Sequence, residues 1–299
     1  MREWLVTWFK AARAPFLVIS FLPALLGGVV AAAHQPVHWG IFAACVIGVV
    51  MAHSAADFID DYFDYKKGNL GNKAEQFHDS PLIDQKVTLN QVLIAIIICL
   101  AISLITGLYV FLQVGMPIVW MVLIGTFIVF FYTSPPVMLN YRGLGETAIF
   151  LAFGPMIITG VYIALTGRFD WEPLLVSLVP GIFTMVIVLV SNTFDFHDDV
   201  KSGKRTFAVR FGQPAAVRLM GISSVIAYLV IILGVVTKMI PVWTLLVLLT
   251  IPLALDTVRF TSHFDVETRY KAAMTRAITV SSIASILLLI AYGIVLLLK

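Results

Sequence analysis

Long apolar stretches alternate with short polar segments along almost the whole chain. Each stretch is close to the roughly 20 residues that an α-helix needs to cross a bilayer. Between the stretches, apolar and polar residues do not alternate with the period of two that a half-buried β-strand shows. The pattern therefore predicts an all-α, polytopic membrane protein with nine transmembrane helices. The stretches run approximately over Pro15–Ala33, Trp39–Ile59, Leu89–Gln113, Gly115–Tyr132, Gly145–Thr166, Pro173–Phe194, Ala215–Thr237, Pro241–Leu255 and Ala272–Leu298.

The composition agrees with a membrane-embedded chain. Of the 299 residues, 60% are hydrophobic and 12% are charged, and the mean hydropathy of +0.97 excludes an ordinary soluble domain. We expect one membrane-embedded domain over residues 1–299, surrounded by lipid and without a nucleic-acid partner. We interpret the first stretch as a retained span rather than a cleaved signal peptide. A basic flank followed by an apolar run describes any first span with a cytoplasmic amino terminus.

Lysine and arginine are distributed unequally between the two sides that nine spans define. The side of the amino terminus carries 17 of the 20 basic residues, and the other side carries Arg168, Lys238 and Lys299. Because cytoplasmic loops are enriched in Lys and Arg, we expect the amino-terminal side to be cytoplasmic. A wrong number of spans would mix the two groups, so the asymmetry also favours nine.

Two acidic clusters on the cytoplasmic side match each other at a constant offset of 135 residues. A second match, at an offset of 132 residues, involves residue types that often coincide by chance in apolar sequence. Together they predict two parallel four-helix repeats, over about residues 10–140 and 143–270, with a ninth helix and with both clusters facing a central cavity. The clusters are Asp57-x-x-Asp60-x-x-x-Asp64-x-Lys66-x-Gly68 and Asn192-x-x-Asp195-x-x-x-Asp199-x-Lys201-x-Gly203, and the second match pairs Pro23, Gly28 and Trp39 with Pro155, Gly160 and Trp171.

The carboxylates within each cluster follow helical spacing. In the first cluster the spacing i, i+3, i+4, i+7 places all four on one helix face, and we expect the same of the second. Like charges at this spacing repel each other, whereas Mg²⁺ takes hard oxygen ligands and keeps contacts to substrate phosphates. The alternative is an acidic helix end that is simply solvated. The residues concerned are Asp57, Asp60, Asp61 and Asp64, and then Asn192, Asp195, Asp198 and Asp199.

Basic residues follow both clusters. Metal ions alone do not require neighbouring cations, but a diphosphate that bridges two Mg²⁺ ions carries more negative charge than the ions cancel. The alternative is that these residues only mark the cytoplasmic side. They are Lys66, Lys67 and Lys73 after the first cluster, and Lys201, Lys204 and Arg205 after the second.

Four segments carry a more specific pattern. They are Asp60-Asp61-Tyr62-Phe63-Asp64-Tyr65-Lys66-Lys67-Gly68; Asp195-x-x-x-Asp199 with Gly203-Lys204-Arg205-Thr206; Tyr132-Thr133-Ser134-Pro135-Pro136 with Tyr141-x-Gly143-Leu144-Gly145-Glu146; and Arg13-x-Pro15 with Pro23. This combination resembles the UbiA superfamily of intramembrane prenyltransferases, over about residues 10 to 215. The Lys-Lys-Gly ending and the Gly-Leu-Gly-Glu loop are most similar to the menaquinone branch, which prenylates 1,4-dihydroxy-2-naphthoate.

The resemblance implies nine helices around a central cavity, two Mg²⁺ ions, an isoprenyl diphosphate donor such as geranylgeranyl diphosphate, and a lipophilic aromatic acceptor. Departures from the family pattern are Asp60 in place of a usual Asn, Gly68 in place of a frequent third Asp, and Phe194 where the menaquinone branch often has Arg. The last departure leaves the acceptor open. The implied metal ligands are Asp60, Asp61, Asp64, Asp195, Asp198 and Asp199; the implied catalytic residues are Asp60, Asp64, Asp195, Asp199 and Tyr132; and the implied diphosphate ligands are Lys66, Lys67, Lys201, Arg205, Arg13 and Asn192.

Several residues admit two interpretations. Tyr132 and Tyr141 can shield an allylic cation by their ring faces, or they can belong to the aromatic belt at the membrane interface. His53 precedes Asp57 by one turn and can accept the proton of the acceptor, or it can be a packed, hydrogen-bonded histidine. Arg13 reaches the cavity or only anchors the first span.

A different class of protein also fits part of the pattern. Paired carboxylates in duplicated membrane halves occur in cation-coupled transporters. Against a transporter, carrier repeats are more often inverted, and carrier carboxylates tend to lie near mid-membrane. Within the enzyme class, the alternatives are 4-hydroxybenzoate prenylation and O-prenylation of geranylgeranylglyceryl phosphate.

Overall fold

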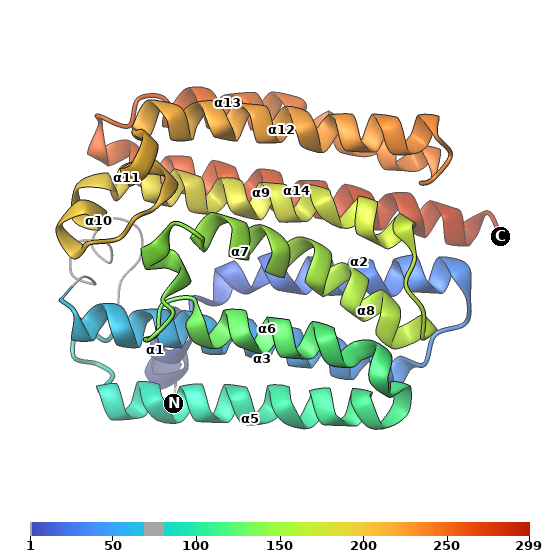
Figure 1. Cartoon of the computed structure of the whole chain (residues 1–299), viewed down its shortest axis with the longest axis horizontal. Helices are drawn as coiled ribbons and strands as arrows, with labels where there is room; N and C mark the ends of the chain where they lie inside the picture. The colour runs from blue at the N-terminus through green and yellow to red at the C-terminus, as the bar shows by residue number, and fades with distance from the viewer. Residues whose placement is uncertain (1, 69–80) are drawn as a thin grey trace.

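The computed structural model describes residues 2–68 and 81–299, which form a helical bundle without a β-strand in these two ranges. The long helices run side by side, and the carboxyl end of α3 lies at the same end of the bundle as α10 and α11 (Figure 1). The helices are α1 Arg2–Ala11, α2 Val18–His34, α3 Trp39–Lys66, α5 Leu89–Val114, α6 Val119–Phe131, α7 Gly145–Leu151, α8 Ile157–Thr166, α9 Trp171–Phe194, α10 Phe196–Ser202, α11 Phe207–Phe211, α12 Gln213–Val236, α13 Ile251–Thr261 and α14 Tyr270–Leu297; the shorter turns are η1 Ala14–Leu17, η2 Met116–Ile118, η3 Leu139–Arg142, η4 Ala152–Met156, η5 Val242–Thr250 and η6 Glu267–Arg269.

Eight helices in the described part of the chain are long and apolar enough to cross a membrane. They correspond to all the predicted stretches but the fourth, Gly115–Tyr132, which forms a shorter apolar helix over Met116–Phe131. The all-α membrane class is therefore confirmed, and the ninth crossing stays a prediction. The eighth stretch reaches span length because the 3-10 turn η5 continues directly into α13, giving one helix over Val242–Thr261.

The outer faces of the bundle are apolar. On α5, for example, Leu104 is 71% exposed and Leu112 is 70% exposed. Such side chains on a soluble surface would form a large apolar patch, whereas lipid chains solvate them. Inside the bundle, α2 buries Ala24, Leu26 and Ala31 completely, consistent with the small residues that let membrane helices pack closely.

The segment from α7 to α8 is one membrane span that contains a π-helical turn, η4, around Pro155. Proline lacks the N–H that an α-helix would need at this position, so the local hydrogen-bond pattern changes there. Gly154 in this turn faces Gly181 of α9, and a Cβ on Gly154 would lie 2.7 Å from the Gly181 Cα atom. The two glycines allow η4 and α9 to pack backbone against backbone.

The two acidic clusters end in different local structures. Helix α3 continues through the whole first cluster to Lys66, as the spacing predicts. The second cluster does not share one continuous helix face, and that expectation is wrong: α9 ends at Phe194, and Asp195 has φ −78° and ψ 6°. A new helix, α10, begins at Phe196.

Candidate active site

The first acidic cluster lies on the inner face of α3. Asp57, Asp60 and Asp64 line a central cavity, and the Asp64 residue is 1% exposed. The Thr133 hydroxyl, from the loop after α6, donates a hydrogen bond of 2.5 Å to Asp60 Oδ1. Helical spacing therefore brings these carboxylates into the cavity, and a second segment fixes the orientation of Asp60.

Arg13 balances part of this negative charge. Its guanidinium donates a short hydrogen bond to Asp61 Oδ1 and lies 3.8 Å from Asp60 Oδ2. Burial alone would lower the pKa of Arg13, but the nearby carboxylates of Asp61, Asp57 and Asp60 raise it above its ordinary value, so the side chain stays charged. Arg13 has the left-handed φ of 46°, a costly conformation for a residue with a side chain. Of the two interpretations of Arg13, its contacts favour the one in which it reaches the cavity.

Asp64 contacts a part of the chain that is distant in sequence. Lys204 Nζ lies 2.9 Å from Asp64 Oδ2, and the two side chains are only 1% and 2% exposed. The Tyr141 hydroxyl donates to the other carboxylate oxygen of Asp64 at 3.0 Å. Lys67 lies over the Tyr141 ring, with its Nζ atom 3.7 Å from the ring centroid. Tyr141 and Lys204 thus join the first cluster to two loops.

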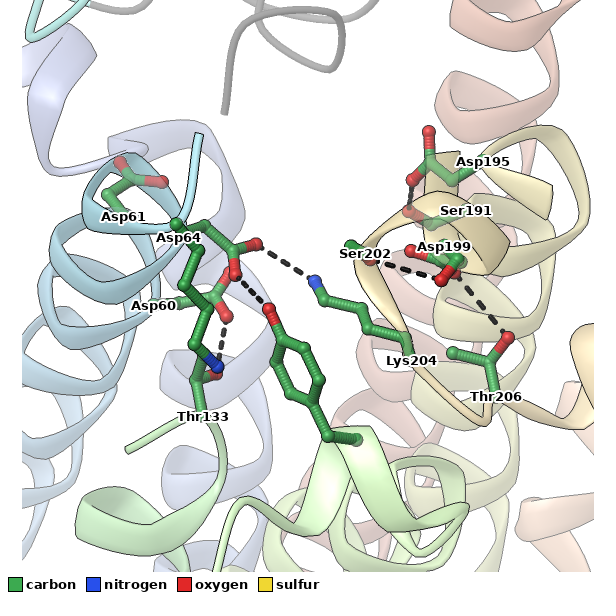
Figure 2. A network of polar contacts seen from close by, with 12 residues as sticks. Asp60, Asp61, Asp64, Thr133, Ser191, Asp195, Asp199, Ser202, Lys204 and Thr206 are labelled. Carbon is green, nitrogen blue, oxygen red and sulfur yellow. Dashed lines mark hydrogen bonds and ion pairs between the residues drawn. The ribbon is translucent and has the colours of Figure 1, made fainter. Parts of the chain in front are cut away.

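The second acidic cluster lies across from the first (Figure 2). Asp195 and Asp199 are each 1% exposed. The Ser191 hydroxyl donates to Asp195 Oδ2 at 2.9 Å, and the Tyr270 hydroxyl donates to the same oxygen at 3.3 Å. The Thr206 hydroxyl lies 3.4 Å from Asp199 Oδ2.

Glu146 ties the loop after α6 to the second cluster. The Asn192 amide donates to Glu146 Oε1 at 2.9 Å, and the backbone N–H of Phe207 donates to the same oxygen at 2.7 Å. Glu146 is 6% exposed. Asn192 also lines the central cavity, so this glutamate holds Asn192 and the start of α11 in place.

The remaining candidate residues lie farther out. Lys201 is 75% exposed in its side chain and lies 3.4 Å from Asp198 Oδ1. Lys66 extends over the Tyr62 ring at 4.5 Å, and Arg205 is exposed. Lys73 lies outside the described residues. The structure thus brings Arg13 and the aspartates of the first cluster together, while Lys66, Lys201 and Arg205 occupy the rim.

Sequence reasoning named Lys204 only among the basic residues that follow the second cluster, and it missed Thr133, Glu146, Ser191 and Tyr270 as site residues. Lys204, Thr133 and Glu146 stand inside the motifs that carry the family resemblance, so the motifs were the available signal. Tyr270 has no such signal, because it reaches Asp195 from the last helix, 75 residues away.

The central cavity has a volume of about 420 Å³ and is polar at one end. Along α3 its lining extends from Asp64 to Ala44, which is about 30 Å at 1.5 Å per residue. Beyond the carboxylates the walls are apolar or small, including Met121, Gly160 and Val161. The space suits a long apolar chain with a charged head at the cluster end.

Two further candidates, His53 and Tyr132, both line this cavity. His53 Nδ1 lies 2.9 Å from the Ser20 hydroxyl, and its ring packs edge-on against Phe153 at 4.7 Å. His53 is therefore both packed and placed at the cavity wall. Its Nε2 atom lies 3.7 Å from Asp57 Oδ2, which is too long for a hydrogen bond.

The donor set of the two clusters suits a hard divalent cation. Carboxylate oxygens are the ligands that Mg²⁺ prefers, and Mg²⁺ usually takes one or two carboxylates together with water and substrate phosphates. Within residues 2–68 and 81–299, no group of three His, Cys, Asp or Glu side chains converges closely enough to hold a metal ion alone. The residues therefore suit a hard divalent cation that takes part of its ligands from oxygen atoms other than those of the protein side chains.

Known proteins resemble this chain over most of its length. The model of the UbiA prenyltransferase family matches residues 20–283. The 2-carboxy-1,4-naphthoquinone phytyltransferase of Synechocystis is 26% identical over 86% of this chain and 83% of its own length. The 1,4-dihydroxy-2-naphthoate octaprenyltransferase of Bacillus subtilis is 24% identical over 84% of this chain and 80% of its own length.

Solved structures share the fold. A UbiA homolog from Archaeoglobus fulgidus bound to DMAPP and Mg²⁺ superposes with a TM-score of 0.69 at 16% sequence identity, covering 98% of this chain and 100% of that one. At this identity the likeness concerns the arrangement of helices.

Proposed function

Because the chain belongs to the UbiA prenyltransferase family, we propose that it transfers an isoprenyl group from a prenyl diphosphate to a lipophilic aromatic acceptor of the 1,4-dihydroxy-2-naphthoate type. The observation that carries this proposal is the first acidic cluster, which lines the polar end of a long apolar cavity together with Asn192, and the buried second cluster across from it (Figure 2). A cation-coupled transporter, the alternative from another class, does not agree with membership of a family of transferases. Relatives that are named for prenylation of a naphthoate or naphthoquinone support this choice of acceptor.

We propose that Asp60 and Asp64 hold one Mg²⁺ ion and that Asp195 and Asp199 hold the other, supported by Asp61, Asp198 and Asn192. When bound, Mg²⁺ supplies positive charge that stabilises the departing diphosphate. We propose that the two clusters have equivalent roles because the chain is a parallel duplication, in which α6 completes nine crossings. This proposal is supported by Trp39 and Trp171, which begin α3 and α9.

The chain itself contributes cations at the site and apolar cavity walls that exclude water. Arg13, Lys67 and Lys204 lie at the first cluster and take up charge on the leaving diphosphate as the allylic C–O bond ionises. Lys66, Lys201 and Arg205 at the rim attract the substrate. The apolar walls keep water from the allylic cation, and the Tyr132 ring shields it at the cavity wall. An electron-rich aromatic carbon then attacks, and His53 is placed to receive the released proton.

The orientation in the membrane follows from the charge partition. With nine crossings, 17 of 20 basic residues lie on the side of the acidic clusters. We therefore place the active site at the cytoplasmic face of an integral membrane protein.

A panel of acceptors tests the proposed reaction. The purified chain in lipid, given geranylgeranyl diphosphate and Mg²⁺, is expected to prenylate 1,4-dihydroxy-2-naphthoate and to leave 4-hydroxybenzoate and geranylgeranylglyceryl phosphate unmodified, as judged by mass spectrometry of the products. Prenylation of geranylgeranylglyceryl phosphate alone would contradict the aromatic acceptor and favour O-prenylation.

Filling the deep end of the cavity is expected to shorten the accepted prenyl chain. Gly160 lines the cavity, and an added Cβ would lie at an ordinary contact distance of 3.7 Å from Met121 Cβ. In Gly160→Leu the new side chain therefore occupies cavity space. Discrimination in apolar pockets amounts to about 10–200-fold per methylene, so kcat/KM for geranylgeranyl relative to dimethylallyl diphosphate should fall at least about tenfold.

The matched control is Gly293→Leu on α14, where the described part of the chain leaves the space around an added Cβ open. This variant should keep the wild-type ratio of the two donors, and Gly160→Ala should lie between. An unchanged ratio in a folded Gly160→Leu variant contradicts a prenyl chain that runs along this cavity.

A further inference from the structure

Lys204 lies between the two acidic clusters and makes a hydrogen bond to a residue of each. Its backbone N–H donates to the Asp199 carbonyl at 2.9 Å, so its main chain is part of the second cluster. Its ammonium instead reaches Asp64 of the first cluster, 140 residues away, at 2.9 Å. Figure 2 shows the Lys204 side chain extended across the gap from the loop after α10 toward Asp64.

The local sequence explains this direction. Gly203 has φ +77°, the left-handed conformation that ends helix α10 and that glycine adopts without strain. The turn sends the following residue back toward the cavity, which Lys204 lines. The neighbouring Lys201, before the turn, remains 75% exposed.

Because Lys204 and Asp64 are both buried, each charge needs the other as its counter-ion. The Lys204 and Asp64 side chains are 1% and 2% exposed, and an isolated charge at such a site is strongly unfavourable. Arg13 has a comparable relation to Asp61. Each of these carboxylates is therefore neutralised by a cation of the protein itself.

A metal ion held by Asp64 would compete with this ammonium. Lys204 Nζ lies at hydrogen-bond distance from Asp64 Oδ2, so a cation bound by that oxygen would have to displace it. Once displaced, the ammonium requires a new anion, because the surrounding site is buried. A diphosphate placed between the clusters supplies that anion.

We propose that Lys204 is an internal counter-ion of Asp64 and that its ammonium moves from Asp64 to the diphosphate when Mg²⁺ binds. This exchange makes metal and prenyl diphosphate bind cooperatively. The inference rests on the proposed function, since it assumes metal and diphosphate at this site. In the exchange one ion pair is replaced by two, Asp64 with the metal and Lys204 with the diphosphate. By linkage, each ligand then raises the affinity for the other by the same factor.

Two affinities of the purified full-length chain test the exchange. The first is the affinity for Mn²⁺, used in place of Mg²⁺ and measured by electron paramagnetic resonance without diphosphate. The second is the affinity for a fluorescent geranyl diphosphate analogue, measured without divalent cation and at saturating Mg²⁺. In the wild type, Mg²⁺ should tighten binding of the analogue about 5–150-fold, the usual range of such coupling.

Lys204→Met removes the ammonium that competes with the metal for Asp64. Mn²⁺ alone should therefore bind this variant about tenfold more tightly than the wild type. The tightening of analogue binding by Mg²⁺ should shrink by a similar factor. The metal-free variant should also melt at a lower temperature, because Asp64 has lost its counter-ion, and Mg²⁺ should raise that temperature more than it does for the wild type. A purely structural role of Lys204 would weaken metal binding together with stability, which is the opposite result.

The matched control is Lys86→Met, which removes an exposed lysine that lies 3.2 Å from Asp84 and should change neither affinity. Lys204→Arg keeps the charge and should stay near the wild-type Mn²⁺ affinity. Where Lys204→Met does not fold, Lys204→Gln supplies the same comparison.

Equal or weaker Mn²⁺ binding by both neutral variants overturns the exchange and leaves the proposed function standing. A wild-type chain that binds neither Mn²⁺ nor the analogue overturns the proposed function, and the exchange with it.

Discussion

Asparagine at Asp64 or Asp199 is expected to lower turnover at saturating Mg²⁺ by at least about 10²–10³-fold, the usual loss when one transition-state electrostatic contact is removed. The substitution keeps the shape of the side chain and removes the charge that faces the metal. Asp64 and Asp199 occupy equivalent positions in the two motifs. The two variants should therefore be similarly impaired, as should Asp60→Asn and Asp195→Asn.

Asp57→Asn should be milder, because its counterpart in the second motif is already the uncharged Asn192. Asp84→Asn serves as the control, since Asp84 contacts Lys86 at the exposed surface. Asp64→Asn also leaves Lys204 without its buried partner, so the melting temperature of each variant must accompany the rate. Equal damage in Asp57→Asn and Asp64→Asn, or near-normal turnover of Asp199→Asn, contradicts the twofold assignment of ligands.

The sequence predicts the fold and the first cluster well because both depend on local periodicity. Apolar runs of span length predict which segments cross the membrane, and the described residues contain eight helices that are long and apolar enough to do so. The spacing of Asp57, Asp60 and Asp64 places them on one face of α3, where they line the cavity.

The remaining features of the site depend on long-range contacts or on local backbone geometry, which the periodicity of the sequence does not reveal. The Lys204–Asp64 pair joins residues 140 positions apart, so no helical spacing reveals it. The break at Asp195 arises from a single ψ angle of 6° within a sequence whose spacing alone suggests a continuous helix. Among the basic residues, composition does not distinguish the buried Lys204 from the exposed Lys201, because the turn at Gly203 makes that difference.

Removal of divalent metal is expected to abolish prenyl transfer. Carboxylates of the first cluster line the cavity, and the cations nearest to them, Arg13 and Lys204, are already engaged with Asp61 and Asp64. Without Mg²⁺, a diphosphate entering this site would therefore meet negative charge that no metal offsets. The expected loss is larger than for any single aspartate, because both clusters then lack metal at once.

The most direct measurement follows transfer of labelled geranylgeranyl diphosphate to 1,4-dihydroxy-2-naphthoate by the purified chain in lipid, first with Mg²⁺, then with excess EDTA, and finally with Mg²⁺ restored. The account predicts that product formation falls to the background level in EDTA and returns with Mg²⁺. Full activity in excess EDTA would contradict the claim that the two aspartate clusters act by holding metal.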